Sequence, residues 1–137
     1  MKYWLPALAW MLFIFIGSTD LLSAEHTSRY IGPFLRWFAP DLSDAAIGTV
    51  QLVVRKCGHL TEYAILAALL VRALGGFGAA FILAAIYAGL DEFHQSFVAS
   101  RTASVWDVTI DCLGAVIGLI LYRLLRNRRE RSARASE

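Results

Sequence analysis

Long apolar stretches alternate with short polar ones along this chain, and this pattern predicts four membrane-spanning helices. A helix needs ~20 predominantly apolar residues to cross the hydrocarbon core of a bilayer. The stretches that meet or approach this length are residues 4–22, 57–74, 77–97 and 105–125. In the third, the uncharged part ends at Leu90, so its helix must continue through Asp91 to about residue 97. We therefore expect an all-α, integral membrane four-helix bundle formed by residues 1–126.

The first stretch has an alternative interpretation. Lys2, a short apolar run and the sequence Leu22-Ser23-Ala24 are also typical of a cleaved secretory signal peptide. We favour an uncleaved helix because residues 4–22 are just long enough to span. Either interpretation leaves residue 25 on the outer side of the membrane.

The connection from residue 25 to residue 55 has mixed character and predicts an interfacial helical segment between the first and second spans. Aromatic residues follow near-helical spacing around two arginines, a pattern typical of a helix that lies in the interface plane. These residues are Tyr30, Phe34, Trp37 and Phe38, with Arg29 and Arg36. We expect Gly32-Pro33 to break this element. After Pro40, Asp41 or Ser43 can cap a new helix that continues into the second span.

Composition agrees with a membrane protein. The chain is 58% hydrophobic and 18% charged, whereas soluble domains are usually about 25% charged. The net charge of +2 is too small to indicate nucleic-acid binding. Cys57 and Cys112 adjoin apolar segments, and we interpret them as small buried thiols rather than a disulfide or a metal site.

Basic residues predict the orientation in the membrane. Lys2, Arg72 and the arginine-rich segment 127–137 fall at one end of the predicted spans. Under the positive-inside rule these positions face the cytoplasm. We therefore expect a multi-pass protein of the cytoplasmic (inner) membrane with both termini in the cytoplasm. Residues 127–137 would form a basic cytoplasmic tail, and the outer side would carry the 25–55 connection and the 91–104 turn.

Polar side chains gather around the turn between the third and fourth spans. Charged groups at the end of apolar segments are costly to bury, so they indicate a functional site. At ~100° per residue, three helical stripes bring such side chains together. The stripes are Lys56, His59 and Tyr63, with Glu62 farther round; Tyr87, Asp91, His94 and Gln95; and Asp107, Asp111, Gly114 and Gly118. Gly114 and Gly118 allow a neighbouring helix to approach closely. We expect an outward-facing polar pocket.

At these residues the sequence resembles the VanZ-like family of bacterial membrane proteins. The resemblance rests on Lys56-x-x-His59-x-x-Glu62-Tyr63-x-x-Leu66, then Asp91, Glu92, Gln95 and Phe97, then Arg101, Asp107, Gly114 and Gly118. Two positions depart from the family pattern. Asp111 stands where Asn is common, and Arg55 stands where an acidic residue is common. The family is associated with reduced susceptibility to teicoplanin-type glycopeptides, which implies a role in the cell envelope.

The residue types suggest separate roles. Asp91, Glu92 and His59 are the candidate catalytic acid–base groups, because an imidazole beside carboxylates can titrate near neutrality. Lys56 and Arg101 are the candidate anion-binding groups. The supporting residues are Glu62, Tyr63, Gln95, Asp107 and Asp111. The histidine spacing matches no dedicated metal motif, so we expect no metal site, whereas the sequence leaves the question of a cofactor open.

Three functions remain open. In the first, the pocket binds, and in an enzymatic version processes, an anionic membrane lipid or lipid-linked envelope precursor. In the second, a non-enzymatic envelope or interaction factor uses the charges as an ion-pair network that holds the helices in register. The third, a transporter or ion pathway, is weaker because the inner halves of the spans carry little polarity beyond Arg72 and Arg123. The sequence indicates no nucleic-acid partner and leaves the oligomeric state open.

Overall fold

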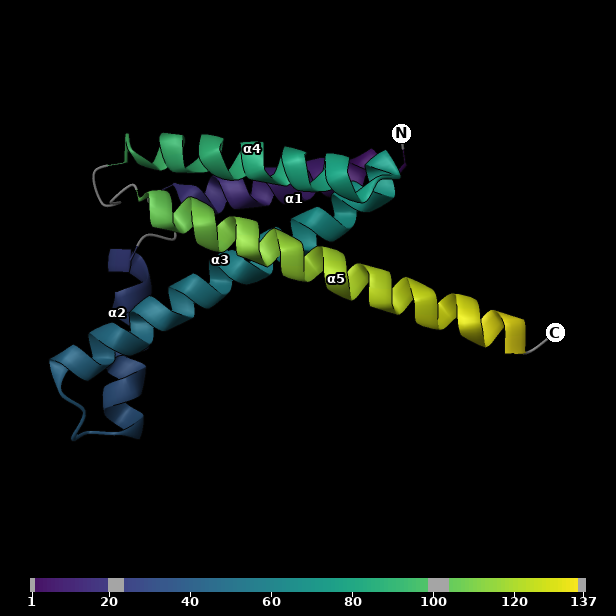
Figure 1. The fold of residues 1–137 in the computed structure, drawn as a ribbon. Coiled ribbons are helices and arrows are strands. Elements are labelled where there is room, and N and C mark those ends of the chain that lie inside the picture. Colours follow the sequence, from purple (N-terminus) through teal and green to yellow (C-terminus); the bar gives the residue numbers. More distant parts are fainter. Residues whose placement is uncertain (1, 20–23, 99–103, 136–137) are drawn as a thin grey trace.

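The computed structural model describes residues 2–19, 24–98 and 104–135, and within these ranges the side chains of residues 24–30 are not described. Five helices make up these ranges (Figure 1). They are α1 (Trp4–Ser18), α2 (Ala24–Phe38), α3 (Asp44–Leu74), α4 (Phe77–Gln95) and α5 (Val105–Ala135). The prediction of an all-α fold is confirmed.

Helix α3 is a single helix of 31 residues, about 46 Å long at 1.5 Å per residue. Ser43 caps its start, because its hydroxyl oxygen accepts a hydrogen bond from the Ala46 amide at 3.3 Å. Gly75 ends it in the left-handed region at φ 76°, a conformation that favours glycine. The predicted second span, residues 57–74, is therefore the C-terminal part of a longer helix.

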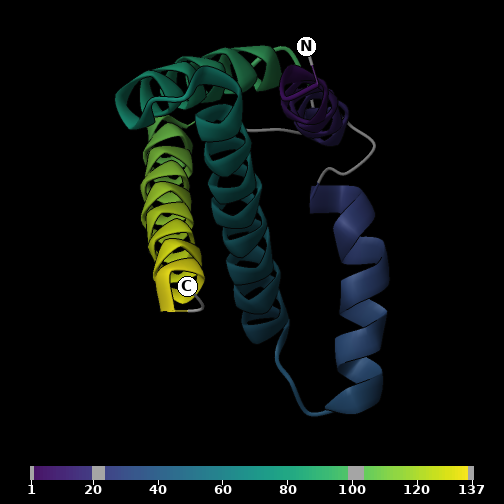
Figure 2. The same cartoon turned by 90° about the vertical axis from the view of Figure 1, so that its right-hand side faces the viewer.

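Helix α2 corrects one prediction, since it continues through Gly32 and Pro33 without a break. Pro33 is exposed and removes only one helical hydrogen bond. The helix contacts α3 and no other described helix, and Figure 2 shows it apart from the remaining helices. Arg36 forms an ion pair with Asp44 at the start of α3. Phe34, Trp37 and Phe38 are exposed, as a helix lying at the membrane interface requires.

Three helices, α3, α4 and α5, are long and apolar enough to cross a membrane. Helix α1 has 15 residues, about 22 Å, and is shorter than the ~30 Å hydrocarbon core. A bundle of four spanning helices is thus not shown, although α1 does pack against α3 and α4. Helix α4 ends at Gln95, and α5 continues past residue 125 to Ala135. Arg126 and Glu130 support this extension with an i,i+4 ion pair at 3.4 Å.

The α3–α5 pair is the most extensive helix contact in the described structure. The two helices run in the same direction and cross in Figure 1. A Cβ atom added at Gly114 would clash with the backbone of Leu60, and one added at Gly118 would clash with the backbone of Ala64. Only glycine permits this approach, as predicted from the sequence. Helix α4 adds a buried alanine stripe of Ala80, Ala84 and Ala88.

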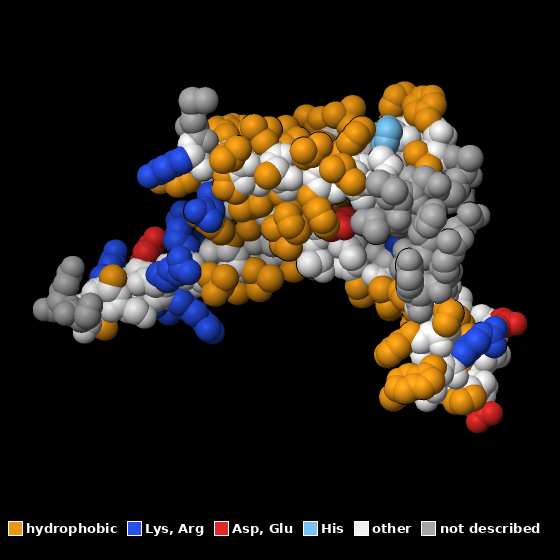
Figure 3. Space-filling model, turned by 180° about the vertical axis from the view of Figure 1, so that it is seen from behind, with side chains coloured by type: hydrophobic (Ala, Val, Ile, Leu, Met, Phe, Trp, Pro, Cys, Tyr) orange, Lys and Arg blue, Asp and Glu red, His pale blue; other side chains and the backbone are white. Residues whose placement is uncertain are grey.

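Basic side chains gather at one end of the molecule. The start of α1, the end of α3 and the C-terminal part of α5 carry Lys2, Arg72 and the arginines from Arg123 onward. Figure 3 shows Lys and Arg side chains at this end and a broad hydrophobic surface next to them. The opposite end carries α2 and the polar residues described next.

Candidate functional site

Two pairs of polar side chains connect α3 with α5 at the end opposite the arginines. Lys56 Nζ forms an ion pair with Asp107 Oδ1. One turn farther along, His59 Nδ1 lies 3.2 Å from Asp111 Oδ1. Both helices repeat polar residues every three or four positions and run in parallel, so the two pairs lie one turn apart along the same contact. We call these two pairs the α3–α5 ladder. The glycine contacts at Leu60 and Ala64 follow directly below it.

Helix α4 supplies a second set of polar groups, which reaches α1. Gln95 Nε2 donates to Asp91 Oδ2 at 2.9 Å and to Ser18 Oγ at 3.4 Å. Closer to the arginine end of α4 and α1, the Tyr87 hydroxyl donates to the Met11 carbonyl at 2.6 Å. These contacts place Asp91 between α1 and the α3–α5 ladder, where it interacts electrostatically with His59.

Glu92 points to a different partner from its neighbour Asp91. Its Oε1 accepts a hydrogen bond from the backbone amide of Ser104, just before α5 begins. It also interacts electrostatically with Asp107, Asp111 and His59. The two successive carboxylates therefore have different partners, Gln95 for Asp91 and the Ser104 amide for Glu92.

The cluster is buried and holds more acids than bases among the described residues. Its carboxyl groups are Asp91, Glu92, Asp107 and Asp111, of which Asp111 is 0% and Asp91 3% exposed. Lys56 and His59 are its described bases. Asp91 Oδ1, Asp111 Oδ2 and the Tyr63 hydroxyl have no hydrogen-bond partner among the described residues, and Asp111 Oδ1 has only its 3.2 Å contact with His59 Nδ1. Buried polar atoms of this kind need a proton, a cation, an ordered water or a polar ligand to be stable.

The structure thus brings most of the predicted site residues together. Arg101 lies outside the described residues. Glu62 is half-buried and interacts electrostatically with His59 and Tyr63, while its backbone carbonyl accepts a 2.9 Å hydrogen bond from Trp10 Nε1 of α1. His94 stacks against Phe15 of α1, with ring centroids 4.6 Å apart. Its ring therefore packs on the α1 side of the cluster.

Sequence reasoning missed Ser18 and Ser104, which both contact cluster carboxylates or their partners. Ser18 could have been noticed as a hydroxyl at the C-terminal end of an otherwise apolar run. Cys57 is exposed, so the prediction of a buried thiol is wrong at this position, and Cys112 is half-buried. Both cysteines are free. Among the described residues, no three His, Cys, Asp or Glu side chains are placed to hold a metal ion.

The chain matches a known protein family over most of its length. A model of the VanZ/LLP1 family matches residues 3–126, which covers all the described helices except the end of α5. No curated protein and no solved structure gave a match. The match covers far more than half of the chain and confirms the resemblance seen in the sequence. This chain belongs to the VanZ/LLP1 family.

Proposed function

We propose that this protein binds an anionic lipid or lipid-linked cell-wall precursor at the buried polar cluster. It would act in the cytoplasmic membrane of a bacterial envelope, with both termini in the cytoplasm and the cluster toward the outer leaflet. The observation that supports this most strongly is the convergence of acids and bases from α3, α4 and α5 at one end of apolar helices. Charges in such a place are costly and are usually retained for function.

The chemistry of the cluster suits a ligand that carries both charge and hydrogen-bonding groups. Lys56 is the more exposed of the two described bases of the cluster, with its side chain 27% exposed against 10% for His59. An anionic headgroup would share Lys56 with Asp107, and Arg101 would provide a second, forked donor set. The unsatisfied oxygens of Tyr63, Asp91 and Asp111 could then bond to hydroxyl or amide groups of the same ligand.

Any reaction at this site would be an acid–base step. His59 lies 3.2 Å from Asp111 and within electrostatic reach of Asp91 and Glu92, so a proton could pass between imidazole and carboxylate. General acid–base catalysis needs such a group within hydrogen-bond reach of the substrate. We therefore assign Asp91, Glu92 and His59 to this step, with Gln95 and Asp107 as positioning residues.

One observation favours a second candidate, a non-enzymatic factor with a structural ion-pair network. Lys56 is already paired with Asp107, and His59 already contacts Asp111. These contacts hold α3 and α5 in register without any ligand. A buried pair of this kind is weak support for stability but can specify a single arrangement of helices.

The two candidates can be separated by native mass spectrometry of the purified protein together with a folding assay. We expect Asp91→Asn to remove a copurified lipid or precursor while the melting temperature in detergent changes little. Asp41→Asn is the matched control, because the same change is made at an exposed residue outside the cluster. Loss of folding in Asp91→Asn and in His59→Gln, with no ligand on the wild-type protein, would favour the structural network.

The family association with glycopeptide susceptibility can be tested with the same variants. In a bacterial host we expect expression of the wild-type protein to raise the inhibitory concentration of teicoplanin. Asp91→Asn should lose this effect and Asp41→Asn should keep it. An equal effect of all three proteins would argue against a role for the cluster in this phenotype.

A further inference from the structure

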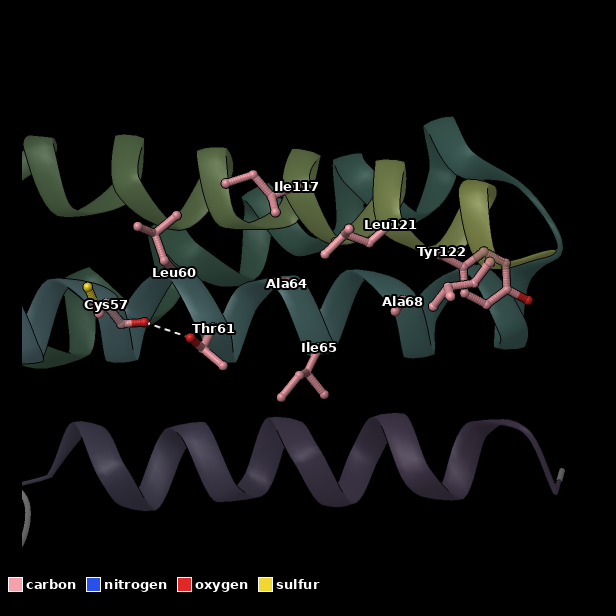
Figure 4. A pocket seen from close by; sticks show the side chains of 11 residues that line it. Cys57, Leu60, Thr61, Ala64, Ile65, Ala68, Ile117, Leu121 and Tyr122 are labelled. Atoms are coloured by element: carbon pink, nitrogen blue, oxygen red, sulfur yellow. Dashed lines mark hydrogen bonds between the residues drawn. The ribbon is translucent and has the colours of Figure 1, made fainter. Parts of the chain in front are cut away.

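A groove runs along α3 and α5 at a different place from the polar cluster. Its first section has a volume of about 540 Å³, and Figure 4 shows the side chains that line it. The lining is almost wholly apolar and includes Ala64, Ile65, Ala68, Leu121 and Leu125. The section begins at Cys57 and Thr61, near the level of the cluster, and descends toward the opposite end of the helices.

A second section, of about 440 Å³, continues the first. Both sections are lined by Ile65, Ala68, Tyr122 and Leu125, so they form one groove. The second section ends among three arginines, Arg72 of α3 and Arg126 and Arg129 of α5. The groove therefore changes from an apolar channel to a basic mouth along its length.

Small residues create the apolar part of the groove. Gly118 lies against the backbone of Ala64, so this level of the helix pair has almost no side-chain volume. Ala68 follows one turn later on α3 and also lines both sections. From Ala64 to Arg72 the helix descends about 12 Å, slightly less than the ~15 Å half-thickness of a bilayer's hydrocarbon core.

The arginines at the mouth have unused binding capacity. Neither Arg72 nor Arg129 has an ionic partner among the described residues, and both are exposed. Arg126 pairs through its Nε with Glu130 at 3.4 Å and lies 5.8 Å from the ring of Phe77. Three positive charges and one negative charge therefore surround the mouth.

We propose that this groove binds one anionic phospholipid from the leaflet at the arginine end, with an acyl chain along Ala64 and Ala68 and the phosphate at Arg72 and Arg129. Basic pockets between transmembrane helices are suited to anionic headgroups. A second copy of the chain in the same membrane orientation fits poorly, because it would bring a like-charged arginine cluster to the same level. The proposal does not depend on the function of the polar cluster at the other end.

The test is native mass spectrometry of the purified full-length protein with added lipid. The probes are phosphatidylglycerol and phosphatidylcholine with identical acyl chains. We expect phosphatidylglycerol to bind more tightly. Replacing Arg72 and Arg129 together (Arg72→Gln with Arg129→Gln) should weaken its binding roughly 30-fold, because each basic residue near a lipid headgroup contributes about fivefold. The matched control, Arg131→Gln with Arg134→Gln, removes the same charge beyond the groove and should change binding by at most about twofold.

Two further variants complete the test. Ala68→Phe fills the apolar section and should weaken binding of both lipids. The Arg72→Gln with Arg129→Gln variant should keep the lipid or precursor that copurifies at the polar cluster, which separates the groove from that cluster. Arg129→Gln alone is an exposed substitution, and it should cost about fivefold even if the double variant folds poorly. Equal binding of the two lipids, an equal loss in the control, or a protein dimer that Ala68→Phe disrupts without any lipid adduct would overturn the proposal.

Discussion

Gly118 of α5 lies directly against the backbone of Ala64 of α3, one turn below the contact between Gly114 and Leu60. This close approach is what brings Lys56 to Asp107 and His59 to Asp111 on the same two helices. The polar cluster therefore depends on glycines that carry no chemistry themselves. A substitution that disturbs this helix contact should therefore also disturb the polar cluster.

Adding a methyl group at the glycine contact should destabilise the protein. In Gly118→Ala the new Cβ would clash with the Ala64 carbonyl, and we expect a loss of about 1–3 kcal/mol in the free energy of unfolding. Gly89→Ala is the control, because a Cβ there has no neighbour within 4 Å. It should be neutral or stabilising by about 0.5–1 kcal/mol. Thermal unfolding in detergent measures both, and equal effects would contradict the packing described.

The Lys56–Asp107 pair should show measurable coupling in a double-mutant cycle. Lys56→Met and Asp107→Asn each leave a partly buried charge alone, so the double variant should be less destabilised than the sum of the two. We expect a coupling energy of about 1–3 kcal/mol. The exposed pair Arg36–Asp44, with side chains 57% and 86% exposed, should give less than about 1 kcal/mol. Coupling no larger in the first pair than in the second would show that Lys56 and Asp107 do not meet.

Helix α1 should be held by its hydrogen bonds to α3 and α4. Removing the hydroxyl in Tyr87→Phe leaves the Met11 carbonyl without its 2.6 Å donor, at an expected cost of about 0.5–1.5 kcal/mol. Tyr122→Phe removes a hydroxyl with no hydrogen bond to a described residue and should change stability less.

The intact mass of the wild-type protein should include residues 1–23. A mass that begins after residue 24 would instead support the signal-peptide interpretation.

Orientation in the membrane can be read from cysteine labelling. In a variant with both native cysteines replaced, a membrane-impermeant maleimide should label Ser43→Cys in intact cells. Ser132→Cys should be labelled only after lysis. This follows from the basic residues gathered at one end of α1, α3 and α5. The reverse pattern would move the polar cluster to the cytoplasmic side and remove the basis for an outer-leaflet ligand.

Helical periodicity predicted the cluster well because its main contacts repeat every three or four residues on two parallel helices. Lys56 and His59 on one helix, and Asp107 and Asp111 on the other, could be assigned to facing stripes from spacing alone. The glycines that bring the stripes together were equally visible.

Contacts between distant segments could not be predicted in this way. Ser18 meets Gln95 because α1 runs beside α4, and nothing in the spacing of either residue specifies that partner. The predicted break at Gly32-Pro33 was wrong because it rested on a local rule about proline. Helix α2 continues through Pro33, an exposed residue that removes only one helical hydrogen bond. Cys57 is exposed because it turns away from the stripe occupied by Lys56 and His59.

The most direct test of the central claim is an experimental structure of the protein purified with its native lipids. The account predicts density for a headgroup or precursor at the cluster, within hydrogen-bond distance of Lys56 and of at least one unsatisfied oxygen of Tyr63, Asp91 or Asp111. A structure in which protein side chains alone satisfy every one of these atoms, with no density beside them, would contradict it.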